Sequence, residues 1–335
     1  MRPSARRLVF SSLRPYSKLS DNLKDYDLFI NPSPRHIDLY MEQQGKHRPD
    51  FKRQDISTWQ ASWGDDYRFG LIFPKGTDDV AFSYQITNYK SLGYQPDFQQ
   101  VGMAWVPEKF RGREILSVVT QCLMEEGMKR KNTLACNVVW SQNFWRQASG
   151  NADVSSCIYY ISYYDLEEFK LPGIQENGIF VKNISTATMN DALSYDKSVF
   201  PFSRDNWMRR LFTEGIARIA YDAAGNVIGI GCLSVYPSGE CVISPLYADN
   251  KKAAQLLFQS ILKETLEMHR EKRLWRMQVR SNDQCRGSFR WIEPFLKRPP
   301  RRVHLSNLCY SLYPPRHFFN FSKVFVNSHP TNGPC

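Results

Sequence analysis

The sequence lacks the residues that define several enzyme classes. It has no G-x-x-x-x-G-K-[ST] phosphate loop, no H-E-x-x-H pair and no G-x-S-x-G turn, so P-loop, zinc-protease and esterase chemistry have no motif to carry them. Its six histidines are scattered, and no Cys/His set has the spacing of metal ligands. We therefore expect no metal cofactor.

Long apolar runs and paired cysteines are also missing. No stretch approaches the roughly 20 apolar residues that span a bilayer, so we expect no membrane partner. The eight cysteines show no C-x-x-C pairing, and most lie within apolar runs, as Cys232 does in residues 227–233. This usage indicates buried thiols in a reducing compartment rather than a disulfide framework.

The positive charge is concentrated in two places. The formal net charge is +11, yet five basic residues precede the first acid, Asp21, and several arginines cluster between 298 and 316. The rest of the chain is only mildly basic, so the total does not require a polyanionic partner. Aromatic residues beside basic ones at 275–276 and 290–291 could bind nucleic acid. Packing explains them more simply, and we expect no nucleic-acid partner.

Residues 1–19 are rich in Arg and Ser and contain no acid. A helix formed by them would carry an apolar face opposite a basic one, which is typical of a mitochondrial transit peptide. Residues 14–17 resemble the R-x-Y pattern of matrix processing, with cleavage after Tyr16. We expect a location in the mitochondrial matrix. The alternative is a basic N-terminus without a targeting role.

A chain of 335 residues has room for two domains of about 150 residues each. In the first part, short apolar runs predict strands at 67–73, 80–87 and 99–106, which would form an antiparallel meander. The period then changes to that of an amphipathic helix over 114–131. Strand-like segments follow at 133–140 and 156–164.

The polar stretch 166–177 contains Pro172 and Gly173 and predicts a linker, after which the pattern begins again. Strands are expected at 179–184, 217–221, 227–236, 240–246, 274–279 and 305–312. Helices are expected at 189–199, 205–213, 251–268 and 284–295. The predicted organisation is a leader (1–19), an N-terminal domain (20–165), a linker (166–177), a C-terminal domain (178–313) and a tail (314–335).

The two halves superpose without gaps. Val106 falls on Leu246, Val139 on Val279, and Ser141 on Ser281. This agreement favours an internal duplication of one fold.

The segment 106–116 leads from a predicted strand into the first amphipathic helix. Arg111 and Arg113 flank Gly112 there, where exposed backbone N–H groups and basic side chains can bind a pyrophosphate. The segment resembles the acetyl-CoA motif of the GNAT superfamily, a Val-x-Pro step followed by R-x-x-G-x-G. The alternative is an ordinary helix start with basic surface residues.

Residues 243–254 take the equivalent place in the second half. Their Pro-Leu-Tyr-Ala-Asp segment, followed by an Ala- and Leu-rich helix, resembles the C-terminal GNAT-like domain of YitH-type acetyltransferases. The resemblance covers residues 178–312 and, more loosely, 25–165, and this combination is similar to a nematode group of tandem acetyltransferase-like proteins. At the same offset Lys251 falls on Arg111, and Ala253 and Ala254 could replace the glycines.

The resemblance implies an α/β (α+β) protein with two tandem GNAT folds, each a mixed, mostly antiparallel sheet flanked by helices. In this family the fourth and fifth strands separate, and the pantetheine arm of acetyl-CoA or another acyl-CoA pairs with the fourth strand. The implied contacts are Trp105, Val106, Arg111, Gly112, Arg113, Asn143, Leu246, Tyr247, Lys251, Lys252, Ala253 and Asn282. Either Asn could instead cap a helix.

The implied activity is N-acyl transfer to a small-molecule or amino-group acceptor. This chemistry needs a base for the amine and often a Tyr that protonates the thiolate. Neither helix after a fifth strand contains a Tyr, and Glu114 and Leu116 stand where the family has glycines. Glu108, Glu240 and Tyr247 are the candidate catalytic residues. The rival hypothesis is a catalytically silent tandem module that binds acyl-CoA or scaffolds a partner.

Overall fold

The computed structural model describes residues 24–44, 52–112, 115, 132–138, 158–272, 274–282, 288–300, 302–310 and 319–327. Within these residues all strands join one continuous sheet with the order β1-β2-β3-β4-β5-β12-β6-β11-β10-β9-β8-β7, and β13 pairs with β10. We call β1–β5 with their helices the N-terminal half and β7–β11 with theirs the C-terminal half. The predicted leader and the predicted helix over 114–131, apart from Ile115, lie outside the described residues.

The N-terminal half is an antiparallel meander covered by two helices. Its strands are β1 (Tyr26–Ile30), β2 (Tyr67–Pro74), β3 (Phe82–Tyr89), β4 (Phe98–Trp105) and β5 (Asn132–Val138), the last parallel to β4. The three strands predicted for the meander are confirmed. The turn after β2 contains Gly76, whose φ of +72° favours glycine.

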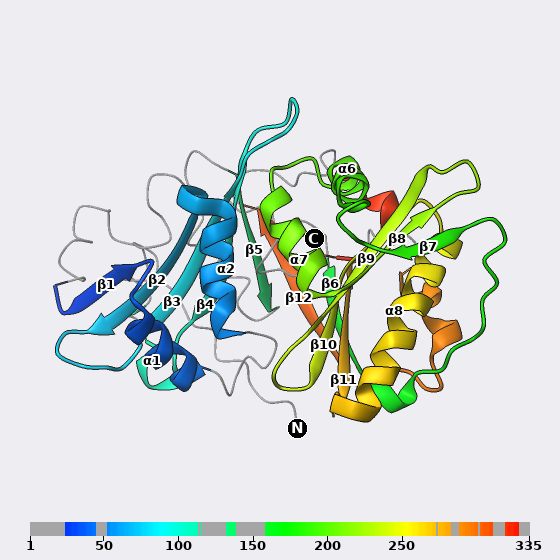
Figure 1. The fold of residues 1–335 in the computed structure, drawn as a ribbon. Helices are drawn as coiled ribbons and strands as arrows, with labels where there is room; N and C mark the ends of the chain where they lie inside the picture. Colours follow the sequence, from blue (N-terminus) through cyan, green and yellow to red (C-terminus); the bar gives the residue numbers. More distant parts are fainter. Residues whose placement is uncertain are drawn as a thin grey trace, which may run out of the picture.

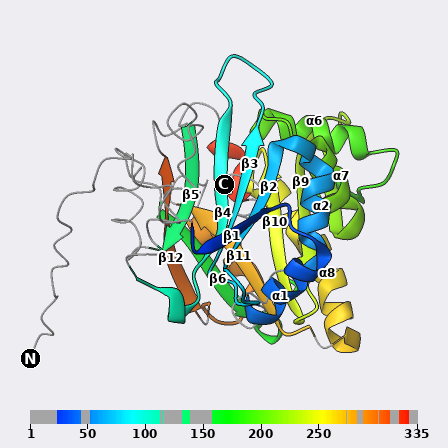
Figure 2. The same ribbon diagram turned by 90° about the vertical axis from the view of Figure 1, so that its left-hand side faces the viewer.

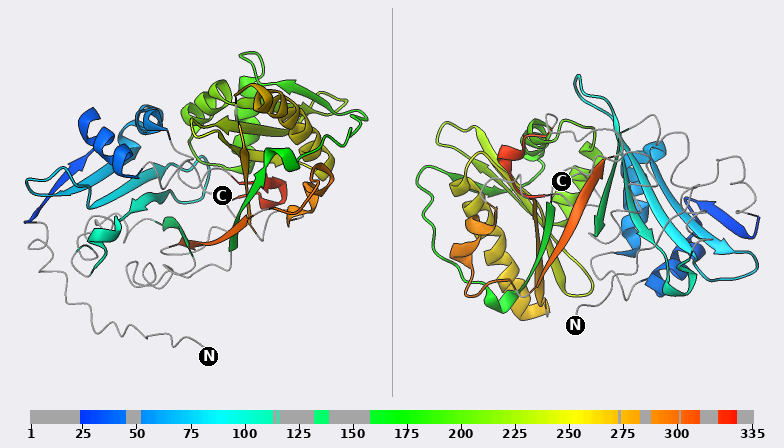
Figure 3. Two further views of the ribbon diagram at one scale, coloured as in Figure 1. Left: turned by 90° about the horizontal axis from the view of Figure 1, so that it is seen from below. Right: turned by 180° about the vertical axis from the view of Figure 1, so that it is seen from behind.

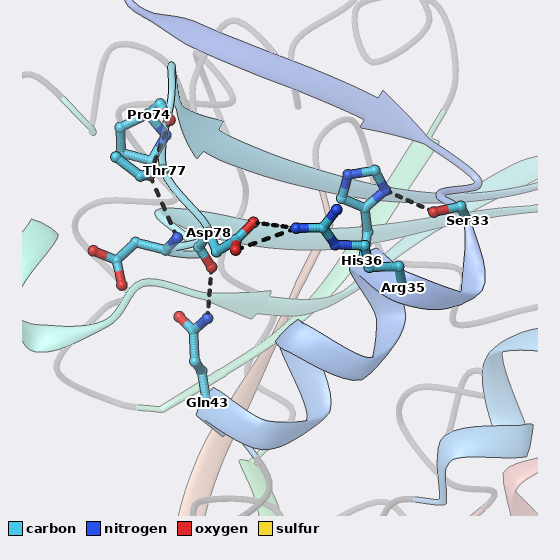
Figure 4. A network of polar contacts seen from close by, with 8 residues as sticks. Ser33, Arg35, His36, Gln43, Pro74, Thr77 and Asp78 are labelled. Atoms are coloured by element: carbon cyan, nitrogen blue, oxygen red, sulfur yellow. Dashed lines mark hydrogen bonds and ion pairs between the residues drawn. The ribbon is translucent and has the colours of Figure 1, made fainter.

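Two helices, α1 (Pro34–Gln44) and α2 (Arg53–Trp63), lie on one face of this meander (Figure 1). Polar contacts fix α1 to the turn between β2 and β3 (Figure 4). The Arg35 guanidinium donates to Asp78 at 3.2 Å, and the Gln43 amide donates to the Asp78 carbonyl oxygen at 2.9 Å. These exposed contacts orient the helix, whereas buried Tyr40 and the partly buried Ile37, Leu39 and Met41 pack it against the core.

The C-terminal half repeats the arrangement of the strands. Its strands are β7 (Phe180–Asn183), β8 (Ile216–Tyr221), β9 (Val227–Val235), β10 (Glu240–Ala248) and β11 (Arg276–Asn282), with β11 parallel to β10. Its helices are α6 (Met189–Val199), α7 (Asp205–Glu214) and α8 (Lys251–Lys272). One prediction needs correction. Within the described part of 284–295, two short 3-10 helices, η6 (Ser288–Trp291) and η7 (Glu293–Phe295), replace the expected single helix, because Pro294 cannot supply a helical N–H.

The last strands of the two halves are exchanged. β6 (Ile158–Asp165) pairs with β11, with Ser162 opposite Val279. β12 (Arg302–Tyr310) pairs with β5, with Leu308 opposite Cys136. The two exchanged strands also pair with each other, so the sheet is unbroken (Figures 1 and 2). The predicted boundary at residues 166–177 stays a prediction, but three strand pairings of the sheet, β6 with β11, β5 with β12 and β6 with β12, join residues on its two sides.

One hydrophobic cluster spans both halves. Trp207 of α7 stacks on Trp63 of α2 with ring centroids 5.7 Å apart and meets Trp59 edge-on at 6.3 Å. A second cluster lies under α8 and includes Leu257, Phe258 and Trp291. The helices α1, α2, α6 and α7 therefore share one core, while α8 covers the other face of the C-terminal half.

The C-terminal segment returns to this half. Residues 319–327, which we call the strap, contain the 3-10 helix η8 (Phe321–Lys323) and β13 (Val324–Val326). Figure 3 shows the strap in red beside the C-terminal half, where β13 pairs antiparallel with β10. For the segment from residue 314 the sequence predicts either a wrapping arm or a loose tail, and no strand.

Candidate functional site

β4 carries an extra residue that bends it. Gly102 lies opposite Gln85 and Trp105 opposite Ser83, so three steps on β4 face two on β3. Met103 in this bulge has a φ of 52°, the left-handed region that non-glycine residues rarely occupy, and the Ser83 hydroxyl donates to its carbonyl oxygen at 2.8 Å. Such bulges redirect a strand and end its pairing.

The pairing between β4 and β5 ends just before the bulge. The last parallel pair is Val101 with Ala135. Beyond Val101, no described residue pairs with β4 on the side of β5. The two parallel strands therefore separate, as the resemblance implied for the strands that hold a pantetheine arm.

The loop after β4 presents basic groups. We call residues 106–112, which contain the 3-10 helix η3 (Glu108–Phe110), the β4 loop. Arg111 is exposed, and its Nε donates to the Val106 carbonyl oxygen at 3.1 Å. Gly112 is also exposed, and a Cβ added there would meet no atom within 4 Å. Backbone and guanidinium at this point are accessible to an anion.

The remaining predicted residues of the N-terminal half surround this loop only in part. Trp105 is half-buried and meets the ring of Tyr40 edge-on at 6.0 Å. Glu108 is exposed in the β4 loop. Arg113 and Asn143 lie outside the described residues.

β10 has the same bulge as β4. Ile243 lies opposite Leu233 and Leu246 opposite Gly231, again three steps against two. The two bulges align Trp105 with Leu246, one residue away from the alignment of Val106 with Leu246 that the sequence suggested. The sequence could not locate the extra residue, because both strands read as continuous apolar runs.

Leu246 and Tyr247 are fully buried and paired. Their strand partners are Val326 and Val324 of the strap. The Tyr247 hydroxyl accepts a hydrogen bond from Arg204 at 3.3 Å, and Arg204 is itself buried against Asp196 at 2.6 Å. Tyr247 thus belongs to a buried polar network under α6 and α7.

At the start of α8, a side chain of the protein already accepts a hydrogen bond from a backbone N–H group of the first turn. The Asn250 side chain accepts a hydrogen bond from the Ala253 N–H at 2.9 Å, which caps the helix. Asp249, one residue earlier, accepts from the Tyr195 hydroxyl at 2.8 Å and forms an ion pair with Lys323 of the strap at 2.8 Å. A carboxylate at this position opposes binding of a phosphate.

The structure does not bring all of the predicted residues together. Lys251 is exposed and Lys252 half-buried at the start of α8. Glu240 lies at the other end of β10 from Tyr247, roughly 20 Å away at the rise of a strand, and is buried against Arg276. Asn282 ends β11 opposite Tyr159.

Asp249 and Asn250 lie within the segment 243–254 that the sequence singled out, but no capping or pairing role was predicted for either of them, and no strand was predicted in the strap. Asn250 could have been found, because an Asn just before an apolar helix is a common cap signal. The strap could not, because three apolar residues are too few to show a period.

The described residues contain neither a group of metal ligands nor a helix that could span a membrane. No group of three or more His, Cys, Asp or Glu side chains there could hold a metal ion. Among the helices of those residues, none combines the length and the apolar character needed to cross a bilayer.

Solved structures show which class of fold this geometry represents. A putative acetyltransferase from Pyrococcus horikoshii is similar over 92% of this chain and 96% of that chain, with 15% identity and a TM-score of 0.64. A tandem GNAT protein from the clavulanic acid biosynthesis pathway is similar over 86% of this chain and 100% of that chain (11% identity, TM-score 0.59). Saccharomyces cerevisiae N-myristoyltransferase with bound myristoyl-CoA is similar over 93% of this chain and 83% of that chain (8% identity, TM-score 0.59). The fold is that of tandem GNAT units.

Family models place the chain more closely. A model described as "Protein of unknown function (DUF1248)" matches residues 23–199, more than half of the chain, and the protein belongs to this family. A model described as an acetyltransferase (GNAT) domain matches residues 192–284. No curated protein matches the chain.

Proposed function

We propose that this protein is an N-acyltransferase that uses acetyl-CoA or a related acyl-CoA, bound by the N-terminal half. The observation that supports this proposal is the separation of β4 from β5 at Val101, directly before the bulge and the basic β4 loop. A strand edge left open in this way offers backbone groups to the amides of a pantetheine arm, as in β-strand addition. Arg111 and the open backbone at Gly112 would meet the pyrophosphate.

Acyl-CoA would supply an activated thioester. The nitrogen of a neutral amine bonds to its carbonyl carbon, the carbon–sulfur bond breaks, and the thiolate takes up the proton that the amine loses. Glu108 is exposed in the β4 loop and is the described carboxylate nearest in sequence to the bulge. We propose it as the base, with the acceptor an amino group of a small molecule or peptide.

Calorimetric titration of the full chain with acetyl-CoA tests the binding step. Arg111→Ala should weaken the affinity roughly tenfold, because it removes a charge-assisted hydrogen bond to phosphate. Arg210→Ala is the matched control, since Arg210 is exposed on α7, away from the β4 loop, and should leave the affinity unchanged. Absence of any acetyl-CoA binding by the unmodified chain would overturn the proposal.

A thiol-release assay tests turnover. Free thiol is measured with acetyl-CoA and a panel of amino acids and polyamines, and Glu108→Gln should lower the rate with little change in acetyl-CoA affinity. The second candidate, a silent module, is favoured by Glu114 and Leu116 in place of the family's glycines. Saturable binding without thiol release from any acceptor would support that candidate instead.

We also propose that residues 1–19 direct the protein to the mitochondrial matrix, on the evidence of their basic, acid-free composition. The similarity of the second half to YitH-type acetyltransferases likewise remains part of this proposal. A fluorescent protein fused behind residues 1–19 should enter mitochondria, whereas a fusion with its arginines replaced by glutamine should remain outside.

A further inference from the structure

The strap occupies the C-terminal counterpart of the proposed acyl-CoA site. β10 and β11 pair in parallel only over Glu240–Val242, and β10 then bulges away from β11, as β4 does from β5. In the N-terminal half no described residue pairs with the bulged strand on that side. In the C-terminal half, Val324 and Val326 pair with Tyr247 and Leu246 there.

The strap bridges the two separated strands. β13 pairs with β10 on one side, and the Asn327 N–H donates to the Arg280 carbonyl oxygen of β11 at 2.9 Å on the other. A peptide in this position makes the backbone hydrogen bonds that a pantetheine arm would otherwise make. The gap between the strands is therefore closed by protein backbone.

Side chains hold the strap from both faces of the sheet. Val324 belongs to the core shared with α6 and α7, whereas Phe325 and Val326 belong to the core under α8, and none of the three is more than 2% exposed. The ring of Phe325 meets Trp291 edge-on at 6.3 Å. The strap is thus an integral part of both layers.

The phosphate end of the same site is also filled. The strap's Lys323 binds Asp249 at 2.8 Å, directly before the start of α8. Asn250 already caps that helix through the Ala253 N–H. At the start of α8 the protein therefore already caps the Ala253 N–H and places a carboxylate, Asp249, where a phosphate would be repelled.

We infer that the strap is a built-in replacement for the cofactor in the C-terminal half, so that each chain binds one acyl-CoA, in the N-terminal half only. The contacts alone show that the strap closes the C-terminal half. The stoichiometry of one acyl-CoA per chain rests on the proposed function. Leu246, Tyr247, Lys251, Lys252 and Ala253 then stabilise the fold and do not contact acyl-CoA.

Hydrogen–deuterium exchange of the full chain, with and without saturating acetyl-CoA, tests the inference. Amides of residues 324–327 should exchange slowly without ligand and equally slowly with it, while new protection should appear in 98–112. Faster exchange in 324–327 on adding acetyl-CoA, or new protection in 244–248, would overturn it. Rapid exchange of 324–327 in the free protein would overturn it too.

The two proposals can fail separately. If acetyl-CoA changes exchange nowhere, the proposed function fails, yet slow exchange of the strap without ligand still shows the C-terminal half closed.

A covalent lock provides a second measurement. Leu246 and Val326 are cross-strand partners, so Leu246→Cys with Val326→Cys places two thiols within reach of a disulfide. The oxidised and reduced forms of the double variant should both bind one acetyl-CoA per chain with affinities within about twofold, and oxidised unmodified protein controls for the native cysteines. Loss of binding or a lower stoichiometry on locking would refute the inference.

Discussion

The contribution of the strap to stability can be measured at Phe325. Its ring is 2% exposed and lies among Trp291 and the other side chains under α8. Phe325→Ala removes a buried aromatic ring from a core that cannot fully collapse around the space. The free energy of unfolding should fall by about 3–5 kcal/mol, the range for Phe→Ala in well-packed cores. Such a loss is a large part of the stability of a typical domain.

Equilibrium unfolding in urea provides the assay. The midpoint should shift to lower urea while the slope stays constant, because the surface exposed on unfolding changes little. Tyr94→Ala is the matched control: Tyr94 is fully exposed, and its loss should change the free energy by less than about 0.5 kcal/mol. If Phe325→Ala costs less than about 1 kcal/mol, the strap does not form part of the core, and the reasoning fails.

Three further changes test the packing of the C-terminal half. Asp196→Asn removes the charge that balances buried Arg204, so urea unfolding should show a loss of about 3–5 kcal/mol; a loss under 1 kcal/mol would contradict this account. Gly229→Ala places a Cβ 2.9 Å from the Tyr247 carbonyl oxygen, a backbone atom that cannot easily move away. This substitution should lower the free energy of unfolding by about 1–3 kcal/mol and lower the melting temperature. Burial raises the pKa of Cys232 from 9.0 to about 12, so its contribution to stability is intact below pH 9 and is lost as the pH rises toward 12. The stability of unmodified protein relative to Cys232→Ala should thus fall by about 1.4 kcal/mol per pH unit above 9, and a constant difference would refute the shift.

Local patterns predicted most elements of the C-terminal half. The helix expected over 189–199 has the same bounds as α6, because its buried residues recur with a helical period. In the N-terminal half, α2 was not predicted. Its sequence RQDISTWQASW mixes polar and β-branched residues with few apolar ones, and contacts of Trp59 and Trp63 with Trp207 hold it in place. Those contacts join residues far apart in the sequence.

Only those parts of the candidate site that are formed by residues adjacent in the sequence were predictable. Arg111 and Gly112 follow β4 directly, so their position depends on one strand and one turn. The bulges, the strap and the strand exchange depend on pairing between distant segments. The apolar patterns of β6 and β12 permit each of these strands more than one partner. Sequence reasoning therefore located the segment that follows the bulged strand in each half, but not the feature that distinguishes the halves.

The exchange of β6 and β12 has a consequence for synthesis. The edge of β5 pairs with β12, and about half of the chain separates Cys136 from Leu308. At the usual speed of translation, β12 leaves the ribosome on the order of ten seconds after β5. An open strand edge readily captures other chains. The centre of the sheet is thus completed late in synthesis, and until then β5 lacks the partner that covers its edge in the finished sheet.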